Sequence, residues 1–198
     1  MKEYTIVRRS EEFDWNKIPA VQIDYLLETD PLPISAQAQV CYDDENLYVR
    51  LSAVETNIRA ELFGLLDQIC EDSCLEFFFC PIASDSRYFN IECNPNGCLF
   101  LGFGNNVQNL MRLIPENPPI QPVVKRTTDG WETVYTVPYT FIRQFFPDFS
   151  PAPGAQMRGN FYKCGDETVQ PHYLCWNPVP MQNCAFHNPA RFGILRFE

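Results

Sequence analysis

The stretch from Asp72 to Gly97, DSCLEFFFCPIASDSRYFNIECNPNG, decides the fold class because it contains two segments whose side chains alternate at period two. Each segment has an apolar face and an opposite face that carries a glutamate. Such segments are typical of neighbouring strands in an antiparallel sheet with one side against the core. One face carries Cys74, Glu76, Phe78 and Cys80 followed by Tyr88, Asn90, Glu92 and Asn94, and the other carries Leu75, Phe77, Phe79, Phe89, Ile91 and Cys93.

The row of Tyr, Asn, Glu and Asn side chains over residues 88–94 is a surface of hydrogen-bonding groups backed by an apolar face. Such a surface suits a polar, neutral ligand such as a sugar, because phenols, amides and carboxylates can bond its hydroxyls. The same row also fits the solvent-facing side of an ordinary antiparallel sheet, which is commonly polar. At this point a binding face and a solvated face are both open interpretations.

Strand-like segments recur along the rest of the chain, separated by turns rich in Pro, Gly, Asn and Asp. This pattern predicts an all-β protein, an antiparallel two-sheet β-sandwich with one or two short helices in the connections. No repeat or change of composition marks a boundary, so we expect a single domain over residues 1–198. The expected elements are strands or hairpins at 39–54, 73–80, 87–94, 97–103, 123–137, 157–163 and 192–197, a partly helical insertion at 55–71, a loop at 104–119 and a short helix at 139–146.

The composition indicates a folded, acidic protein. Of 198 residues, 45% are apolar and 14% aromatic, which is enough to bury a substantial core. Seventeen prolines against nine glycines favour short strands and loops over long helices. The formal net charge of −10 works against nucleic acid and anionic membranes, because no basic patch would attract their phosphate groups. We therefore expect neither as a partner.

The first fifteen residues, MKEYTIVRRSEEFDW, are too charged for a signal peptide, and no stretch reaches the length of a transmembrane helix. These features predict a cytoplasmic protein. The nine cysteines, an odd number, then favour reduced thiols that fill space inside strands. A zinc site is the alternative, but the chain has no CxxC pair, and Cys70, Cys74 and Cys80 are spaced by four and six residues.

Two other predicted strands also have polar faces. If these faces lie on one sheet with Glu76 and Glu92, they form a polar surface that bears two arginines and two glutamates. Arg–Glu pairs on neighbouring strands contribute only about 0.2–1 kcal/mol each. The charge pairing therefore fits a solvated face as well as a binding site. The residues on these two faces are Tyr48, Arg50 and Ser52 in one strand and Arg158, Asn160 and Tyr162 in the other.

Short motifs follow one another along nearly the whole chain: YDDENLYV at 42–49, Glu55 with Arg59, DSCLEFF at 72–78, YFNIE at 88–92 with Asn94 and Gly97, RGNFYK at 158–163, Trp176, FHNP at 186–189 and Phe192-Gly193. Their order resembles the family 9 carbohydrate-binding modules, in the broader group of DOMON-like β-sandwiches. It most closely resembles the stand-alone carbohydrate-binding family 9-like proteins. The resemblance implies a two-sheet sandwich that has no catalytic activity and binds a small saccharide, a glycoside or a glycan end.

The resemblance also implies which side chains contact the ligand. Classical members grip the end of a sugar between two tryptophans, while charged and amide side chains bond its hydroxyls. Trp176 corresponds to the later tryptophan, and its loop favours exposure, although it also fits a lid over the end of the sandwich. The earlier tryptophan is missing, and Phe63 in that region has a spacing from Leu62 and Leu66 that favours the core. The predicted ligand-binding residues are Trp176, Glu76, Asn94, Asn160, Arg50, Arg158 and Tyr88.

Two other functions stay open. One is a cytosolic interaction or structural domain whose sugar site has decayed, which the missing tryptophan favours. The other is a glycosidase that uses Glu76 and Glu92, since retaining glycosidases place two carboxyl groups about 5–5.5 Å apart. Nothing in the sequence marks an apolar pocket that would raise either pKa, so we expect no catalytic residue. We expect no cofactor, except that the acidic turn 43–46 has oxygen donors for a structural calcium ion, which classical members carry.

Overall fold

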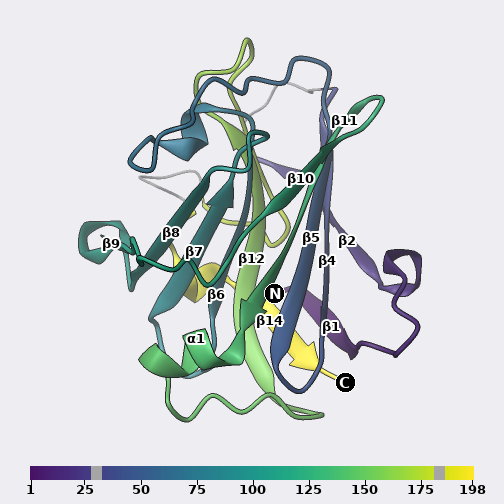
Figure 1. The fold of residues 1–198 in the computed structure, drawn as a ribbon, viewed down its shortest axis with the longest axis vertical. Coiled ribbons are helices and arrows are strands. Elements are labelled where there is room, and N and C mark those ends of the chain that lie inside the picture. The colour runs from purple at the N-terminus through teal and green to yellow at the C-terminus, as the bar shows by residue number, and fades with distance from the viewer. Residues whose placement is uncertain (28–32, 181–185) are drawn as a thin grey trace.

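The computed structural model describes residues 1–27, 33–180 and 186–198, and strands make up most of its regular structure (Figure 1). In these residues one α-helix, α1, spans Tyr139–Phe145, and four 3₁₀ turns are η1 (Trp15–Lys17), η2 (Ile69–Glu71), η3 (Val107–Asn109) and η4 (Pro189–Arg191). The strands are β1 (Glu3–Arg8), β2 (Ala20–Ile23), β3 (Tyr25–Leu26), β4 (Ser35–Tyr42), β5 (Asn46–Val54), β6 (Cys74–Cys80), β7 (Tyr88–Cys93), β8 (Leu99–Gly104), β9 (Met111–Arg112), β10 (Val123–Arg126), β11 (Gly130–Pro138), β12 (Gln156–Gly165), β13 (His172–Cys175) and β14 (Gly193–Phe197).

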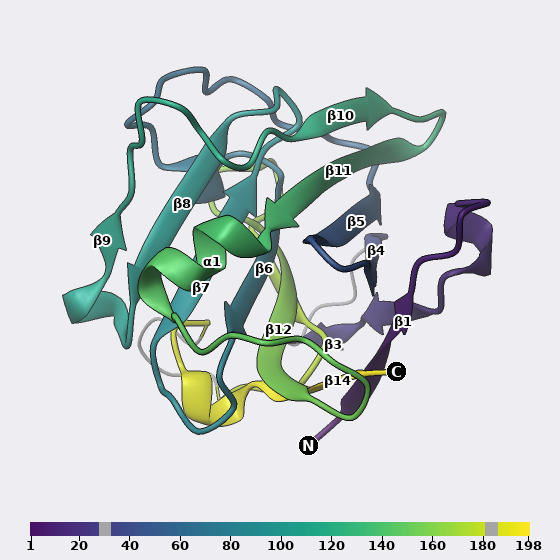
Figure 2. The same cartoon turned by 60° about the horizontal axis from the view of Figure 1, so that its bottom comes forward.

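All of these strands belong to one sheet, which curls so that its two halves face each other (Figure 2). The first half has the order β10-β11-β5-β4, with β2 also on β4, and the second has the order β14-β12-β6-β7-β8-β9. In the second half β13 pairs with β12, and β3 pairs with β13. β1 joins the halves and runs parallel to both neighbours. Residues 3–6 pair with 194–197 of β14, and residues 7–8 pair with 41–42 of β4.

The all-β class predicted from the sequence is confirmed, and every strand pair outside β1 is antiparallel. The finer prediction of two separate antiparallel sheets needs correction. Because β1 changes partner halfway along its length, the halves form one curled, mixed sheet. Alternation along a segment shows which face of a strand is buried, but it does not show which strands pair or in which direction.

The core fills the space between the two halves. From the second half, the rings of Phe77 and Phe79 stack with centroids 4.8 Å apart, and Phe77 stacks on Phe161 at the same distance. From the first half, Val49 and Leu51 of β5 belong to the same fully buried cluster. The apolar faces predicted for residues 47–53, 73–80 and 87–94 therefore all point into this core.

The short helix α1 covers one end of the core, at the lower edge of Figure 1. Pro138 precedes it with a φ of −67°, a conformation that suits the entry to a helix. The rings of Phe141 and Phe145 lie 5.1 and 5.2 Å from the ring of Phe89, so the apolar stripe of the helix closes the core. The predicted helix at 139–146 is confirmed to within one residue. None of the helices in the described part of the chain combines the length and apolar character that a membrane crossing requires.

The insertion at 55–71 is not partly helical as predicted, and its one helical turn is η2. The backbone N–H groups of residues 61–64 donate hydrogen bonds to the carboxylates of Asp67 and Asp72. In a helix these N–H groups would instead bond backbone carbonyls, so the side chains compete with helix formation. Phe63 is 73% exposed in the resulting loop. Its predicted core position is therefore wrong, because the helical spacing on which that prediction depended does not form.

A buried polar network ties the two halves together at the other end of the core. Glu55, just after β5, accepts hydrogen bonds from the Trp131 indole at 2.6 Å and from the Ser73 hydroxyl at 3.1 Å. Lys163 of β12 forms an ion pair with Glu55 at 3.1 Å and donates to Nε2 of His172 at 2.7 Å. Lys163, Glu55 and His172 are almost fully buried, so each depends on the others to satisfy its polar atoms.

Candidate functional site

The polar residues of β6, β7 and β12 lie on the outer face of the second half, away from the core. This face, which we call the covered face, is not solvated. Glu76, Asn90 and Glu92 are 2%, 0% and 7% exposed, respectively. Chain from the C-terminal part packs over it, as shown by the ring of Phe186, which stacks on Tyr162 with centroids 4.0 Å apart. The solvated-face interpretation is therefore wrong for this side of the sheet.

Glu76 and Glu92 lie directly opposite each other on β6 and β7. Glu76 accepts a hydrogen bond from the thiol of Cys164 at 2.8 Å, and Glu92 accepts one from the amide of Asn90 at 2.9 Å. Burial raises the pKa of Glu92 to about 7, although the Asn90 bond and the Arg112 charge lower it. Burial, together with the charge of Glu92, raises the pKa of Glu76 well above its ordinary value. The sequence-based expectation that neither pKa is raised is wrong, because the covering segments exclude water.

Two buried polar atoms at the edge of the covered face have no hydrogen-bond partner: Oδ1 of Asn90 and Nη2 of Arg112. Both residues flank Gly102, with which Asn90 pairs from β7 and Arg112 from β9. The Arg112 guanidinium lies over the ring of Phe100, 4.5 Å from its centroid, and its Nη1 donates to the carbonyl of Asp67 at 3.0 Å. An unpartnered buried polar atom costs about 1–3 kcal/mol, so these two atoms mark the part of the covered face where hydrogen bonding is incomplete.

Sequence reasoning missed Arg112 and did not select Asn90. Arg112 lies in the stretch 104–119, which the sequence analysis took as a loop, whereas the structure has β9 there. A strand of two residues is too short for alternation to show, so no pattern in the sequence assigns Arg112 to a face. Asn90 lies on the predicted polar face, but nothing in its spacing distinguishes it from its neighbours.

Asn94, predicted to bind ligand, uses its whole amide group within the protein. Its Nδ2 donates to the carbonyl of Leu62 and to the carboxylate of Asp72, both at 2.9 Å. Its Oδ1 accepts from the backbone amides of Asn96 at 3.1 Å and Cys98 at 2.9 Å. Asn94 therefore fixes the turn after β7 to the loop that precedes β6.

Asn160 has a similar role on β12. Its Oδ1 accepts from the backbone amide of Asn177 at 2.8 Å, and its Nδ2 donates to the Asn177 carbonyl at 2.8 Å and to the Tyr162 hydroxyl at 3.0 Å. Arg158, two residues earlier on the same strand, donates to three backbone carbonyls at 2.7–2.8 Å. These are the carbonyls of Ala83, Pro189 and Asp85.

The other two predicted site residues of this region also have partners within the protein. The Tyr88 hydroxyl forms a hydrogen bond with Nδ1 of His187 at 2.8 Å. Trp176 is only 3% exposed, so the exposure predicted from its loop position is wrong. Its ring packs in the core 5.7 Å from that of Phe161, and it leaves no room for a Cβ atom at Gly193. Trp176 therefore presents no stacking surface to solvent, and the alternative of a packed tryptophan describes it better.

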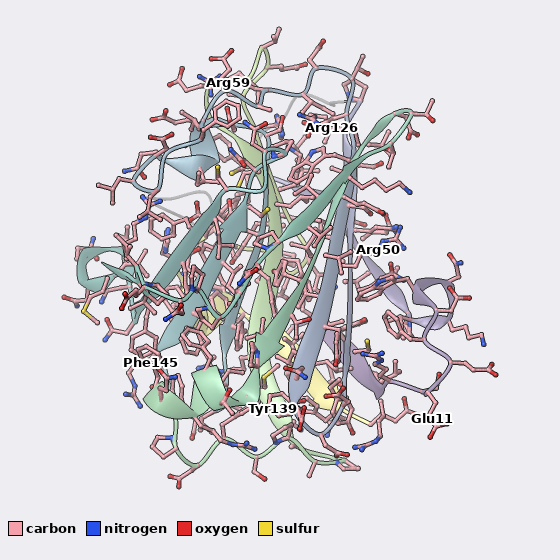
Figure 3. The ribbon with its side chains drawn as sticks, in the orientation of Figure 1. Glu11, Arg50, Arg59, Arg126, Tyr139 and Phe145 are labelled. Atoms are coloured by element: carbon pink, nitrogen blue, oxygen red, sulfur yellow. The ribbon has the colours of Figure 1, made fainter. Side chains whose placement is uncertain are left out.

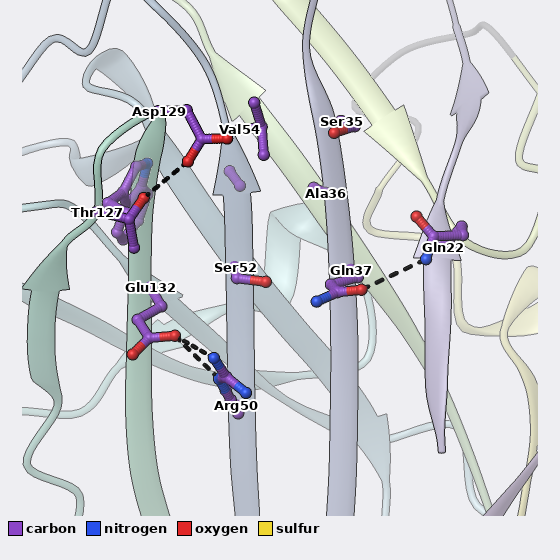
Figure 4. Close-up of a pocket in the computed structure, with 12 residues that line it drawn as sticks. Gln22, Ser35, Ala36, Gln37, Arg50, Ser52, Val54, Thr127, Asp129 and Glu132 are labelled. Carbon is purple, nitrogen blue, oxygen red and sulfur yellow. Dashed lines mark hydrogen bonds and ion pairs between the residues drawn. The ribbon is translucent and has the colours of Figure 1, made fainter. Parts of the chain in front are cut away.

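Arg50 lies on the opposite side of the molecule, on the outer face of the first half (Figure 3). This face, which we call the open face, holds a shallow groove of about 260 Å³ over β2, β4, β5 and β11. Arg50 bonds Glu132 across the strands, and Gln22 donates weakly to Gln37 at 3.4 Å (Figure 4). The polar surface that Arg50 and Glu76 would share if their faces lay on one side of a sheet does not form. The two halves of the sheet face each other, so their outer faces point in opposite directions.

The acidic turn between β4 and β5 uses its carboxylates locally. Asp43 accepts from the backbone amides of Glu45 and Asn46, both at 2.9 Å, and from the Tyr48 hydroxyl at 2.6 Å. Asp44 forms an ion pair with Arg8 at 2.7 Å. These bonds stabilise the hairpin and commit the oxygens that a calcium ion would need, so the turn does not fit the expected ion. Calcium binding elsewhere on the chain stays a prediction.

The eight cysteines in the described residues are free thiols, and the ninth, Cys184, lies outside those residues. Cys74 and Cys164 pair directly across β6 and β12. With Glu76 they form a group in which one possible ligand atom from each residue lies within 4.8 Å of the others. Thiolates and a carboxylate are ligands for a soft metal ion such as Zn²⁺, rather than for Ca²⁺.

Residues 8–197 match carbohydrate-binding family 9. The chain belongs to this family. The resemblance drawn from the motif order is therefore confirmed. No protein with a curated description matches the sequence.

Solved structures of similar fold include a putative carbohydrate-binding protein from Bacteroides uniformis. It is 27% identical, has a TM-score of 0.84, and the alignment covers 100% of this chain and 99% of that one. A family 9 carbohydrate-binding module from Caldicellulosiruptor kristjanssonii was solved in complex with glucose and with cellotriose. Both complexes are 14% identical with a TM-score of 0.71, and cover 100% of this chain and 96% and 94% of theirs, so they show the shared fold.

Proposed function

We propose that this protein is a non-catalytic module that binds a small saccharide, a glycoside or a glycan end at the edge of the covered face. The observation that carries the proposal is the pair of buried, unpartnered atoms, Oδ1 of Asn90 and Nη2 of Arg112. One accepts and the other donates a hydrogen bond, and a sugar hydroxyl can do both. The carboxyl of Glu92, bonded to Asn90, supplies a third polar group beside them.

The surroundings of these groups suit a sugar ring. Phe100 lies beneath the guanidinium of Arg112 and is half-buried, so an aromatic surface adjoins the polar atoms. Aromatic faces cover the apolar C–H patches of a pyranose, while planar amide, carboxyl and guanidinium groups bond its hydroxyls. Membership of a carbohydrate-binding family supports the same ligand class. The sugars bound by the relative from Caldicellulosiruptor kristjanssonii, glucose and cellotriose, are the first to test.

In this proposal the predicted site residues divide into two groups. Glu76 stands behind Glu92 as a second carboxyl, and Tyr88 lies on the same face. Asn160 and Arg158 hold the covering segments in place through their backbone contacts, and Asn94 holds the loop that precedes β6. Trp176 and Arg50 take no part, since one is in the core and the other on the opposite side.

Titration calorimetry with glucose, cellotriose and a panel of other mono- and disaccharides tests the proposal. We expect at least one sugar to bind, and Arg112→Met to weaken that binding by about tenfold or more, since a hydrogen bond to a charged group contributes about 1.5–3 kcal/mol. Arg50→Met on the open face is the matched control and should leave the affinity unchanged. An absence of heat with every sugar, in a protein whose melting curve shows it is folded, would favour the alternative of an interaction or structural domain with a decayed site.

One observation favours a second function, a glycosidase. Glu76 and Glu92 are opposite each other. Burial raises the pKa of Glu92 to about 7, and a general acid works best when its pKa lies near the working pH. If the wild-type protein hydrolyses aryl glycosides and both Glu92→Gln and Glu76→Gln abolish this activity, the function is catalysis rather than binding.

We infer from the free thiols that the protein works in a reducing, cytoplasmic setting. Fractionation of the native cells tests this proposal.

A further inference from the structure

Cys74, Glu76 and Cys164 form a second cluster of reactive side chains, whose two thiols take no part in the proposed sugar site. Cys74 and Glu76 are two residues apart on β6, so their side chains project from the same face. Cys164 is the direct neighbour of Cys74 on β12. The register of the sheet therefore holds all three side chains together without help from a flexible loop.

The distances in this cluster fit one metal ion. The Cys164 sulfur lies 2.8 Å from Oε1 of Glu76, and the three ligand atoms are all within 4.8 Å of one another. In a tetrahedral zinc site with Zn–S near 2.3 Å and Zn–O near 2.1 Å, ligand atoms are separated by about 3.6–3.8 Å. Side-chain shifts of about 1 Å would bring the three ligand atoms to these separations.

The shell around the cluster is the kind that surrounds a structural metal site. Cys74, Glu76 and Cys164 are at most 2% exposed, and the apolar residues packed with the two thiols include Ile69 and Phe100. Cys70 is half-buried, and its carbonyl lies 3.8 Å from the Cys164 sulfur, so a further thiol-bearing residue borders the cluster where solvent begins. A dry shell strengthens the attraction between a cation and its ligands and fixes the geometry of the site.

We propose that Cys74, Cys164 and Glu76 bind one soft divalent metal ion, which in a reducing setting is Zn²⁺. Two thiolates and a carboxylate supply three of the four positions of a tetrahedral site. The ion would join β6 to β12 by a link additional to their backbone hydrogen bonds. Hard ions such as Ca²⁺ and Mg²⁺ are excluded by the sulfur ligands, because they prefer oxygen.

The test is to measure the metal content of the full chain, purified with a reductant and without a chelator, and then to replace zinc by cobalt. We expect close to one zinc ion per chain, and a thiolate-to-cobalt charge-transfer absorption when Co²⁺ is bound. Cys74→Ser, Cys164→Ser and Glu76→Gln should each weaken metal binding by at least about 10–100-fold, which is the loss that removal of a group bonded to a metal ligand causes. Cys41→Ser is the matched control, since Cys41 is also fully buried but lies on β4 in the other half. It should bind zinc and cobalt as the wild type does.

Far-UV circular dichroism and melting curves establish which variants are folded. Should the serine variants not fold, Glu76→Gln, which keeps the size of the side chain, and the cobalt spectrum of the wild type still test the proposal. It is overturned if the folded wild type, refolded with Zn²⁺ or Co²⁺ under reductant, retains no ion and shows no charge-transfer absorption. It is also overturned if folded Cys164→Ser binds as tightly as the wild type, or if mass spectrometry of the reduced preparation finds Cys74 and Cys164 joined in a disulfide.

Discussion

The covered face and the open face look alike along the sequence but differ completely in the structure. Each is a row of alternating polar side chains on central strands, and each has an arginine that the sequence suggested as a ligand donor. Arg50, on the open face, bonds a glutamate on the next strand at the edge of a groove. Arg158, on the covered face, donates to three backbone carbonyls of segments that pack over the sheet.

The difference comes from what packs on each face rather than from the strands themselves. Segments that are distant in sequence pack over the covered face and bury its polar side chains. These side chains then need hydrogen-bond partners within the protein. The charged side chains of the open face stay partly exposed, so water screens them more than it screens the covered face. Whether a polar strand face is buried, solvated or ligand-binding therefore depends on which segment of the chain packs over it. The predictions below test this distinction.

The largest effect is expected from Asn160→Ala on the covered face. The variant leaves the amide and carbonyl of Asn177 buried without their partner, and each such loss costs about 1–3 kcal/mol. We expect a loss of about 3–4 kcal/mol in the free energy of unfolding, measured by urea denaturation. Gln37→Ala on the open face is the control, with an expected change below about 0.5 kcal/mol. Equal losses for the two variants would remove the distinction between the faces.

Arg158→Met should have the next largest effect. Three carbonyl groups lose a charged donor, but Arg158 is half-buried, so water can replace part of what is lost. We expect a loss of about 2–3 kcal/mol in the free energy of unfolding. Limited proteolysis should also cut faster near residues 83–85 and 189, which its guanidinium holds. A variant as stable as the wild type would mean that this arginine is not what anchors the covering segments.

A smaller, pH-dependent effect is expected from His187, which lies on the covered face. Burial lowers the pKa of His187 to about 4, from an ordinary value of 6.5, so the folded protein keeps this ring neutral. The unfolded chain binds the proton first, and stability is therefore complete above pH 6.5 and falls as the pH drops toward 4. His172, whose pKa is also lowered to about 4, contributes to the profile of both proteins. We therefore expect the wild type to lose about 1–2 kcal/mol more stability by pH 5 than His187→Gln does. Parallel profiles between pH 7 and 5 would contradict the burial of this ring.

The smallest effect is expected on the open face. Arg50 and Glu132 are 24% and 15% exposed at the side chain, and pairs of this kind contribute about 0–1 kcal/mol. A double-mutant cycle with Arg50→Met and Glu132→Gln should give a coupling energy below about 1 kcal/mol that decreases further in high salt. A coupling energy of several kcal/mol, insensitive to salt, would show that the open face is also shielded from water.

The sequence predicts the local features of this fold better than the long-range ones. The core faces of β5, β6 and β7 and the helix after Pro138 follow from alternation and from the position of a proline, which depend on neighbouring residues. The partners of β1, the burial of Trp176 and the direction of Arg50 depend on how distant segments pack, which no spacing shows. The same holds for Cys74 and Cys164, which are 90 positions apart in the chain but adjacent in the sheet.

The candidate site was predicted in part for the same reason. Glu76, Glu92 and Asn90 were assigned to one face from period two, and the register places them there. Arg112 comes from a strand too short to have a period. Asn94 and Asn160 have the chemistry of sugar ligands, but backbone groups of nearby turns and loops occupy them, and residue type alone does not distinguish a free amide from an occupied one.

The position of β1 between the two halves has a consequence for biosynthesis. One edge of β1 can pair with β4 once about 42 residues are available, but its other edge must wait for residues 194–197. On the ribosome, the nascent chain therefore carries an unpaired strand edge until residues 194–197 have been synthesised. Such edges recruit strands from other chains, and contacts between residues so far apart in sequence form slowly. Expression at low temperature or with a holdase chaperone should accordingly raise the soluble yield more than changes to the sheet's outer faces do.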